Sequence, residues 1–268
     1  MTMLPIWLQK LSGNHVIIKL IIDETTGDID SYAAMCDLTI MLPCLNEAET
    51  LPVCIKKAKS FLIDNNVNGQ ILVVDNGSTD ESGRIAAECG ADVISVSEQG
   101  YGAALIAGNA AAKGKYVIMA DADDSYDLYG LLPFLDKLEE GYDLVVGNRY
   151  KGGIEKGAMP FLHKYIGNPV LSFMGRTIYK SRVRDFNCGL RGYRKDSISA
   201  LHLEAAGMEY ASEMIIKSEL AGLRITEVPT TLKKDGRSGR SHLRSFPDGW
   251  RHLKIIMKYA PESICRSL

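Results

Sequence analysis

The chain has 268 residues, of which 46% are hydrophobic and 24% charged, so it can bury one large core or two small ones. Its six cysteines include no Cys-x-x-Cys pair and no histidine at metal-ligand spacing, which indicates reduced thiols in a cytoplasmic protein. The longest apolar run near the start, residues 16–22, is too short to span a bilayer and contains Lys19. An acidic stretch follows it, which is not typical of a secretory signal.

Residues 1–36 carry no recognisable motif and are interpreted as an N-terminal extension. From residue 38 onward, short apolar runs alternate with amphipathic helical patterns of about ten residues. This alternation predicts parallel βαβ units and an α/β fold with a doubly wound sheet. Strands are expected at 38–42, 71–74, 93–96, 116–120 and 144–147, and helices at 47–64, 79–90, 103–112 and 132–140.

The pattern is less regular beyond Tyr150. Helices are expected near 161–180, 195–204 and 211–221, followed by a strand at 223–228. Residues 233–258 hold eight Lys and Arg against two acidic residues, although the net charge of the whole chain is −2. We therefore expect a single domain over 37–240 and a basic amphipathic tail over 241–268.

Polar residues follow three of the expected strands, where open α/β sheets bind their ligands. Pro43, Asn46 and Glu47 follow the first strand, Asp75 the second, and Asp121 the fourth. No G-x-G-x-x-G follows the first strand, which argues against a dinucleotide-binding domain.

Asp121 and Asp123 can project two carboxylates to one side of a turn and share Mg²⁺ or Mn²⁺ with a diphosphate. The alternative is a solvated acidic helix start, because carboxylates are stabilised there without any ligand. A calcium loop of the EF-hand type is excluded, since Tyr126 stands at the required glycine and Leu132 at the final glutamate.

Asp75 ends an apolar strand, where a carboxylate needs a partner such as the N–H of a nucleobase. Alternatively it caps its own turn through the amides near Ser78. Gly100 and Gly102 could let a helix approach a nucleotide closely, or they only mark a turn.

Several ordered motifs together resemble family 2 glycosyltransferases of the GT-A fold, and among them the synthases of dolichyl- or polyprenyl-phosphate mannose or glucose. The resemblance runs from about residue 37 to 259. It rests on Pro43-x-x-Asn46-Glu47, the segment 74–80, Gly100-Tyr101-Gly102, Asp121-Ala122-Asp123-Asp124, and the segments 146–150, 185–192, 207–214, 227–229 and 237–250.

This resemblance implies roles by position. A metal, Mg²⁺ or Mn²⁺, would bind Asp121 and Asp123, and Arg237 would lie on a loop that closes on the diphosphate. The residues implied to contact the nucleotide sugar are Pro43, Leu45, Asn46, Glu47, Asp75, Gly102, Asp121, Ala122, Asp123, Arg237 and Ser241. Leu45, Asn76 and Gln99 depart from residues common in the family, which leaves the choice between uridine and guanosine open.

The same resemblance places Arg149, Lys164 and Asn168 at the phosphate of a lipid acceptor, with Lys164 and Asn168 on one helix face. Asp123, Arg149, Glu213 and Arg237 are the expected catalytic residues, although Glu213 could equally be a helix-terminal charge. An anionic phosphate acceptor needs positioning more than deprotonation, whereas a sugar hydroxyl would need a base, for which Glu213 and Asp185 are candidates.

The basic tail suits a lipid acceptor. Trp250, Leu253, Ile256 and Met257 can form one apolar face beside cationic residues, as in helices that lie in a membrane interface, or they can form an ordinary packed helix. We expect a nucleotide-sugar donor, a polyprenyl-phosphate acceptor, no nucleic-acid partner, and a location at the cytoplasmic face of a membrane. The alternatives are transfer to a soluble saccharide or metabolite, a silent nucleotide-sugar-binding protein, and a nucleotidyltransferase.

Overall fold

The computed structural model describes residues 36–237 and 245–265. All of them belong to one compact unit, Ala34–Leu268. The expected N-terminal extension therefore lies outside the described residues except for Cys36, and Ser241 lies in the gap between the two described ranges.

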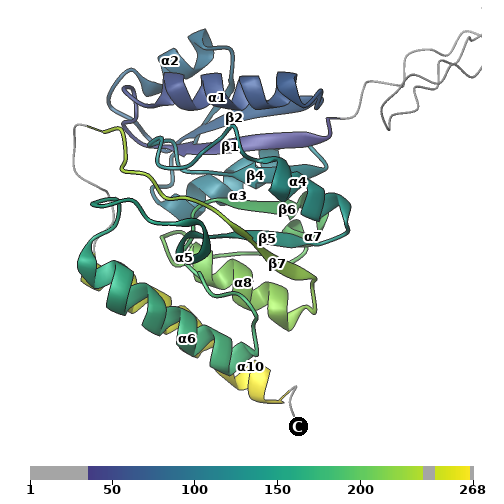
Figure 1. The fold of residues 1–268 in the computed structure, drawn as a ribbon, viewed down its shortest axis with the longest axis vertical. Helices are drawn as coiled ribbons and strands as arrows, with labels where there is room; N and C mark the ends of the chain where they lie inside the picture. Colours follow the sequence, from purple (N-terminus) through teal and green to yellow (C-terminus); the bar gives the residue numbers. More distant parts are fainter. Residues whose placement is uncertain (1–35, 238–244, 266–268) are drawn as a thin grey trace, which may run out of the picture. The chain divides into compact units, whose positions relative to one another are not determined.

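The core of the unit is one sheet of seven strands in the order β3-β2-β1-β4-β6-β5-β7 (Figure 1). All neighbouring strands are parallel except β6, which is antiparallel to both β4 and β5. The predicted α/β fold with a mostly parallel sheet is confirmed. The strands are β1 (Leu38–Cys44), β2 (Gly69–Asp75), β3 (Asp92–Ser95), β4 (Tyr116–Met119), β5 (Leu144–Asn148), β6 (Arg191–Arg194) and β7 (Ile225–Pro229).

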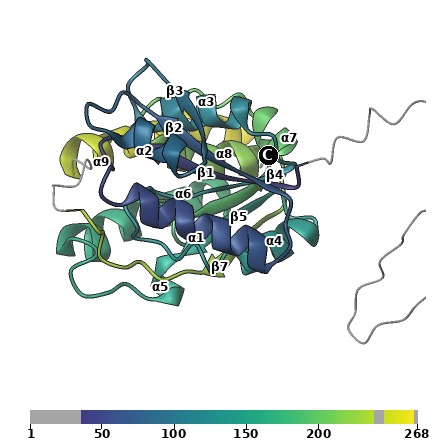
Figure 2. The same ribbon diagram turned by 90° about the horizontal axis from the view of Figure 1, so that it is seen from above.

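Helices cover both faces of this sheet. Helices α1 and α4 lie on one face and α3, α7 and α8 on the other (Figure 2), while α6, α9 and α10 pack together next to α8. The helices are α1 (Leu51–Asp64), α2 (Ser82–Glu88), α3 (Tyr101–Ala111), α4 (Leu132–Glu139), α5 (Arg149–Gly152), the π-helix η1 (His163–Gly167), α6 (Asn168–Tyr179), α7 (Lys195–Ser199), α8 (Tyr210–Leu220), α9 (Ser245–Lys258) and α10 (Ala260–Cys265).

The central strands are apolar along their whole length because helices bury them from both sides. Every residue of β1 and of β4 is buried. The buried hydroxyl of Thr39 donates to Gln70 at 2.8 Å, so the polar exception in β1 is satisfied. This rigid centre fixes the ends of β1, β2 and β4, where the predicted site residues lie.

Three features differ from the sequence-based expectation. Strand β6 was not predicted, because four residues that include Arg191 and Arg194 carry no apolar run. The helix expected over 161–180 is divided between η1 and α6. Of the two alternatives for the tail helix, Ile256 is buried in the core as in an ordinary packed helix, whereas Trp250 and Met257 are exposed.

Candidate functional site

The carboxyl ends of the parallel strands bring the predicted donor residues to one edge of the sheet. Cys44 at the end of β1 pairs with Asp75 at the end of β2, and β4 ends at Met119 beside Met41. The loops that carry Glu47, Asp75 and Asp121 therefore leave the sheet side by side, as the topology of open α/β sheets requires.

Asn46 joins the first two of these loops. It adopts a left-handed backbone conformation, with φ of 57°, which asparagine tolerates better than most residues. Its side-chain oxygen accepts hydrogen bonds from the amides of Thr79 at 2.7 Å and Asp80 at 3.3 Å. Its own amide donates to the Ser78 hydroxyl at 2.9 Å. Asn46 thus shapes the site by fixing its loops.

Asp75 and Asn76 organise the next loop. One oxygen of Asp75 accepts from the Ser78 amide at 2.9 Å, which is the turn-capping alternative considered for this residue. Asn76 donates to the Glu98 carbonyl at 2.7 Å and accepts from the Gly100 amide at 2.7 Å. Asn76 therefore ties the loop after β2 to the start of α3.

Gly102 lies where backbone segments approach each other closely. A Cβ atom added there would lie 1.9 Å from the Ala205 carbonyl oxygen, and the neighbouring Ala103 amide donates to Ala206 at 3.1 Å. Protein backbone thus fills the space that a side chain at residue 102 would occupy. The absence of a side chain at Gly102 is explained by this packing rather than by a nucleotide.

The two carboxylates after β4 differ in their surroundings. Asp121 accepts a hydrogen bond from the Tyr101 hydroxyl at 2.9 Å. Asp123 accepts from the Ser125 amide at 3.1 Å through one oxygen. Ala122 between them is buried, and its carbonyl accepts from the Thr50 hydroxyl at 2.7 Å. Hydrogen bonds thus hold Asp121, Ala122 and Asp123 in place.

Arg237 lies on this acidic cluster. Its guanidinium contacts Glu47 and Asp123 at 2.9 Å each and Asp235 at 3.1 Å. The loop that carries it is anchored by the Gly236 amide, which donates to the Asp123 carbonyl at 2.9 Å. The predicted proximity of Arg237 to Asp123 is therefore present, but in this structure Arg237 binds the carboxylates themselves.

The cluster is strongly anionic apart from that guanidinium. Burial raises the pKa of Glu47 to about 7, with Arg237 opposing and Asp123 reinforcing the shift. Burial and the charge of Asp123 raise the pKa of Asp121 to about 6. Since raised carboxyl pKa values mean that negative charge is costly there, a cation would be stabilised in this cluster.

A divalent cation fits these residues. Within residues 36–237 and 245–265, no group of three or more His, Cys, Asp or Glu side chains is arranged to hold a metal ion. Two carboxylates suffice for Mg²⁺ or Mn²⁺ only when substrate phosphates and waters complete the coordination. Asp121 and Asp123 therefore suit a metal that arrives with a diphosphate, and Arg237 would have to release Asp123.

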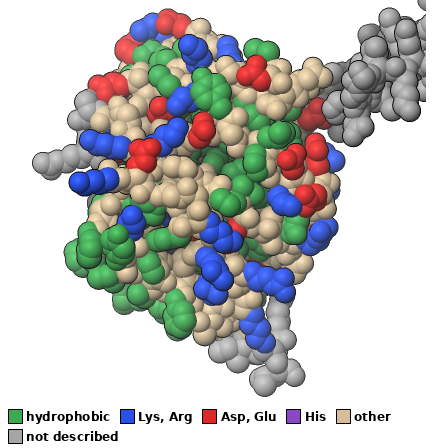
Figure 3. Space-filling model, in the orientation of Figure 1, with side chains coloured by type: hydrophobic (Ala, Val, Ile, Leu, Met, Phe, Trp, Pro, Cys, Tyr) green, Lys and Arg blue, Asp and Glu red, His purple; other side chains and the backbone are tan. Residues whose placement is uncertain are grey.

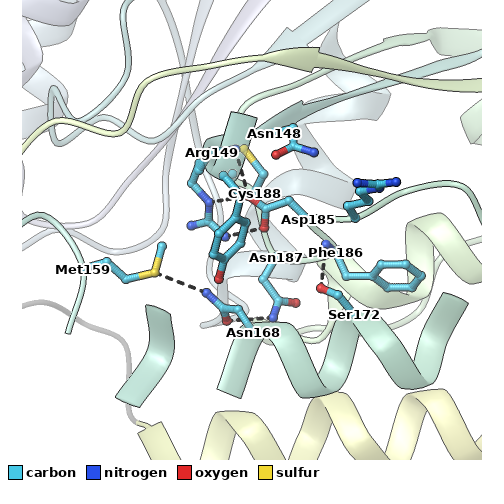
Figure 4. A network of polar contacts seen from close by, with 12 residues as sticks. Asn148, Arg149, Met159, Asn168, Ser172, Asp185, Phe186, Asn187 and Cys188 are labelled. Carbon is cyan, nitrogen blue, oxygen red and sulfur yellow. Dashed lines mark hydrogen bonds and ion pairs between the residues drawn. The ribbon is translucent and has the colours of Figure 1, made fainter. Parts of the chain in front are cut away.

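A second polar cluster lies beyond the end of β5 (Figure 4). Arg149 forms two hydrogen bonds of 2.7 Å with the two oxygens of Asp185, and both side chains are buried. Glu227 accepts from the amides of Arg184 at 2.6 Å and Asp185 at 3.1 Å, and from Asn148 at 2.9 Å. The position of Arg149 is thus fixed by two acidic residues.

Lys164 and Asn168 lie next to this cluster, on η1 and at the first residue of α6. Asn168 accepts from Asn187 at 3.0 Å and donates to the Met159 sulfur at 3.5 Å (Figure 4). The Tyr150 hydroxyl donates to the Lys164 carbonyl at 3.1 Å, which holds η1 against α5. Lys164 is partly exposed, whereas the charge of Arg149 is already balanced by Asp185.

Comparison with protein families matches residues 39–201 to glycosyl transferase family 2. The chain belongs to this family. Its relatives include the low-salt glycan biosynthesis hexosyltransferase Agl6 of Haloferax volcanii, which is 38% identical over 89% of this chain and 57% of that protein. The chain thus spans little more than half of Agl6. The dolichyl-phosphate hexose transferase of the same organism is 31% identical over 86% of this chain and 96% of that protein.

Solved structures agree with the fold. Glucosyl-3-phosphoglycerate synthase from Mycobacterium tuberculosis, in complex with Mn²⁺, UDP and glucosyl-3-phosphoglycerate, superposes with a TM-score of 0.65 at 21% identity. The match covers 84% of this chain and 80% of that one. At this identity the likeness supports the GT-A fold alone. No helix in the described part of this family 2 member is long and apolar enough to cross a membrane.

The expected catalytic residue Glu213 contacts a different set of residues from those of the two polar clusters. It is fully buried in α8 and accepts from the amides of Glu204 and Ala205, from Lys217 and from the Tyr259 hydroxyl. Burial alone would raise its pKa, but these hydrogen bonds lower it. A carboxylate with such partners positions the segment before α8 and is poorly placed to take a proton.

Four side chains that shape the glycosyltransferase site had no role in the sequence analysis. Tyr101 holds Asp121, Asp235 holds Arg237, Glu227 holds the loop of Asp185, and the Tyr126 hydroxyl accepts from the Gly189 amide at 3.0 Å. The short spacing of Asp235 and Arg237 in the sequence could have indicated their ion pair. The other contacts join residues far apart in the sequence, which no local pattern indicates.

Proposed function

We propose that the chain is an inverting, metal-dependent hexosyltransferase that moves a hexose from a nucleotide sugar, of the UDP-glucose or GDP-mannose type, to a polyprenyl phosphate. The observation that carries the proposal is the cluster of Asp121, Asp123 and Arg237. It combines a carboxylate pair that suits a metal–diphosphate with a guanidinium that would lose one of its three carboxylate partners once the metal takes Asp123, and could then bind another anion. The diphosphate of the donor is that anion.

The residues of the donor side then have distinct tasks. Asp121 and Asp123 would hold Mg²⁺ or Mn²⁺, which neutralises charge on the departing nucleoside diphosphate. Arg237 adds hydrogen bonds to the same phosphates, where they strengthen as negative charge accumulates. Glu47 and Asp75, with Pro43 and Leu45, line the loops that would hold base and ribose.

On the acceptor side, the structure favours an acceptor that needs no base. The two base candidates already accept from cationic and amide donors: Glu213 from Lys217 and the amides of Glu204 and Ala205, and Asp185 from the guanidinium and the amide of Arg149. A phosphate acceptor is already anionic, so attraction and orientation are sufficient. Lys164 would supply the attraction and Asn168 a hydrogen-bonding amide, while Arg149, whose charge is balanced by Asp185, would shape the site beside them.

A lipid phosphate is also supported by the relative named dolichyl-phosphate hexose transferase, which matches over nearly its full length. Such an acceptor would place the enzyme at the cytoplasmic face of a membrane. The alternative is a soluble family 2 enzyme that glycosylates a saccharide or small-metabolite hydroxyl.

The test is transfer of radiolabelled hexose from UDP-glucose and from GDP-mannose, with Mg²⁺ or Mn²⁺, into an organic-extractable polyprenyl phosphate. Label in the organic phase identifies both donor and acceptor class. Donor hydrolysis without labelled lipid would contradict the lipid acceptor and favour the soluble alternative.

Lys164→Ala sharpens this test, because we expect about a tenfold higher KM for the acceptor phosphate with little change in donor affinity, as for one lost charge-assisted hydrogen bond. Lys56→Ala is the matched control, since Lys56 is an exposed lysine on α1. Equal effects of the two substitutions would remove Lys164 from the acceptor site.

A further inference from the structure

One short segment of the chain touches both the donor side and the acceptor side of the site. At one end, the Asn187 amide nitrogen donates to the side-chain oxygen of Asn168 at 3.0 Å (Figure 4). Two residues later, Gly189 lies against Asp121: a Cβ atom added to this glycine would lie 2.4 Å from a carboxylate oxygen of Asp121. Residues 187–189 therefore join the proposed metal site to the proposed acceptor-phosphate site.

The backbone of this segment is held by buried side chains. The guanidinium of Arg191 donates to the carbonyls of Phe186 at 2.7 Å and of Cys188 at 2.9 Å. The Gly189 amide donates to the Tyr126 hydroxyl at 3.0 Å. A polar side chain on such a fixed backbone is already ordered before a ligand binds, which lowers the entropy lost on binding.

The hexose lies beside this segment if the proposed function holds. It is bonded to the diphosphate, which would share the metal with Asp121, and the acceptor phosphate attacks it from the other side. Residues 156–184, which include Asn168, hold six Lys and Arg and no Asp or Glu. Lys and Arg predominate on the lower half of the face drawn in Figure 3, whereas Asp and Glu lie mostly on its upper half. This distribution supports an anionic acceptor near Asn168, so the hexose is expected between the two sides, next to residues 187–189.

Asn187 carries an unused hydrogen-bonding group. Its side-chain oxygen is buried and has no hydrogen-bond partner among residues 36–237 and 245–265. An unsatisfied buried polar atom costs about 1 to 3 kcal/mol, so it points to a water, an ion or a ligand as its partner. A hydroxyl group can satisfy this oxygen because it donates a hydrogen bond. A fully ionised phosphate offers only acceptor oxygens, so the oxygen of Asn187 suits the hexose better than the acceptor.

We propose that Asn187 is a specificity-determining residue of the donor site, whose side-chain oxygen accepts a hydrogen bond from a hydroxyl group of the hexose. The inference rests on the proposed function and concerns the hexose rather than the diphosphate. A site that hydrogen-bonds a hydroxyl discriminates strongly against sugars that lack it, because the buried oxygen then stays unpaired. Asn187 thus contributes to the choice of hexose.

The experiment compares the affinity for a nucleotide sugar with the affinity for the free nucleoside diphosphate, by isothermal titration calorimetry with Mg²⁺ and without acceptor. The probes are UDP-glucose with UDP, and GDP-mannose with GDP. In Asn187→Ala we expect about tenfold weaker binding of the nucleotide sugar that the wild type binds, as for one lost hydrogen bond. Binding of its nucleoside diphosphate should not change, whereas a purely structural role would weaken both alike.

Asn109→Ala is the matched control. Asn109 on α3 is half-buried like Asn187, and its amide nitrogen donates to the Ser199 hydroxyl at 2.9 Å. Its side-chain oxygen also has no hydrogen-bond partner within the described part of the chain. It lies about 12 Å along the helix from Tyr101, which contacts Asp121, so we expect both affinities to stay at their wild-type values.

Equal losses for the nucleotide sugar and the nucleoside diphosphate in Asn187→Ala, or no loss for either, would overturn the inference. A change confined to the acceptor KM would also overturn it, because Asn187 would then serve the acceptor. In each of these cases, hexose transfer to polyprenyl phosphate by the wild type would leave the proposed function intact. A wild-type chain that binds neither nucleotide sugar would contradict the proposed function together with the inference.

Discussion

The donor side and the acceptor side of the site balance their charges in opposite ways. At the ends of β1 and β4, Glu47 and Asp123 share one guanidinium with Asp235, so carboxylates are in excess. Beyond β5, Arg149 is buried and neutralised by Asp185 in a two-point contact. In the proposed function the donor side therefore awaits a cation, whereas on the acceptor side Arg149 is already neutralised and an anion would be bound mainly through Lys164.

This difference distinguishes Arg237, which we propose contacts the substrate, from Arg149, which we propose supports the structure of the site. Arg237 can exchange partners, because its guanidinium is partly exposed and held by a loop. Arg149 cannot do so without leaving Asp185 buried and unpaired, which costs several kcal/mol. In the proposed function, the same residue type would thus bind substrate on one side and support the structure on the other. Four substitutions follow, of which those at Asp123, Asp185 and Arg237 test that contrast.

The largest effect is expected for Asp123→Asn. This change keeps the shape and the hydrogen bond from Ser125 but removes the charge that attracts the metal. We expect transfer to fall by at least about 100-fold, as for other lost electrostatic contributions to a transition state. Measurement of kcat with a melting curve checks this; activity near wild type with a chelator present would remove the metal from the donor side.

Asp185→Asn should mainly destabilise the protein. The substitution leaves the buried Arg149 guanidinium without its counter-charge, and the free energy of unfolding should fall by about 3 to 5 kcal/mol. Urea denaturation measures the loss. If stability is unchanged while the acceptor KM rises, the pair serves binding and the contrast with Arg237 fails.

The protein should also lose stability in acid, through His252 of α9. Burial and the nearby Arg191 lower the pKa of His252 to about 4, and its ring pairs with the Ser212 hydroxyl at 2.7 Å. Below the ordinary value of 6.5, the unfolded chain binds a proton that the folded chain does not. Stability is therefore lost as pH falls from about 6.5 to about 4, by up to about 1.4 kcal/mol per pH unit.

His252→Gln provides the comparison, because glutamine does not titrate. Urea unfolding of both proteins across this pH range should show a shallower slope for the variant. If the free energy of unfolding depends on pH equally in both proteins, His252 takes up its proton in the folded chain as readily as in the unfolded chain, contrary to its burial.

The smallest effect is expected for Arg237→Ala. Without nucleotide, Mn²⁺ no longer competes with the guanidinium for Asp123, so its affinity should rise about threefold to tenfold. With the nucleoside diphosphate present, affinity should fall instead, because Arg237 no longer contacts the phosphates. Electron paramagnetic resonance of free Mn²⁺ measures the Mn²⁺ affinity under both conditions. If wild type and variant bind Mn²⁺ equally well in the absence of nucleotide, Arg237 does not compete with the metal for Asp123.

The sequence was sufficient for the donor side because its residues follow parallel strands, and residues after such strands converge at one edge. Asp121, Asp123 and Glu47 could be located in this way. The acceptor side is different: Asp185 precedes the antiparallel strand β6, so it reaches the same region from the entry of a strand. The packing of Gly102 on Ala205 and the hydrogen bonds of Glu213 depend on tertiary contacts that helical spacing does not reveal.

The ion pair of Arg237 with Glu47 joins residues 190 positions apart, and the loop between β7 and α9 closes it. Because a domain generally folds as a unit during synthesis, this contact can close only after Arg237 has left the ribosome. The acidic cluster thus receives its counter-charge from a segment that is synthesised late, close to the end of the domain.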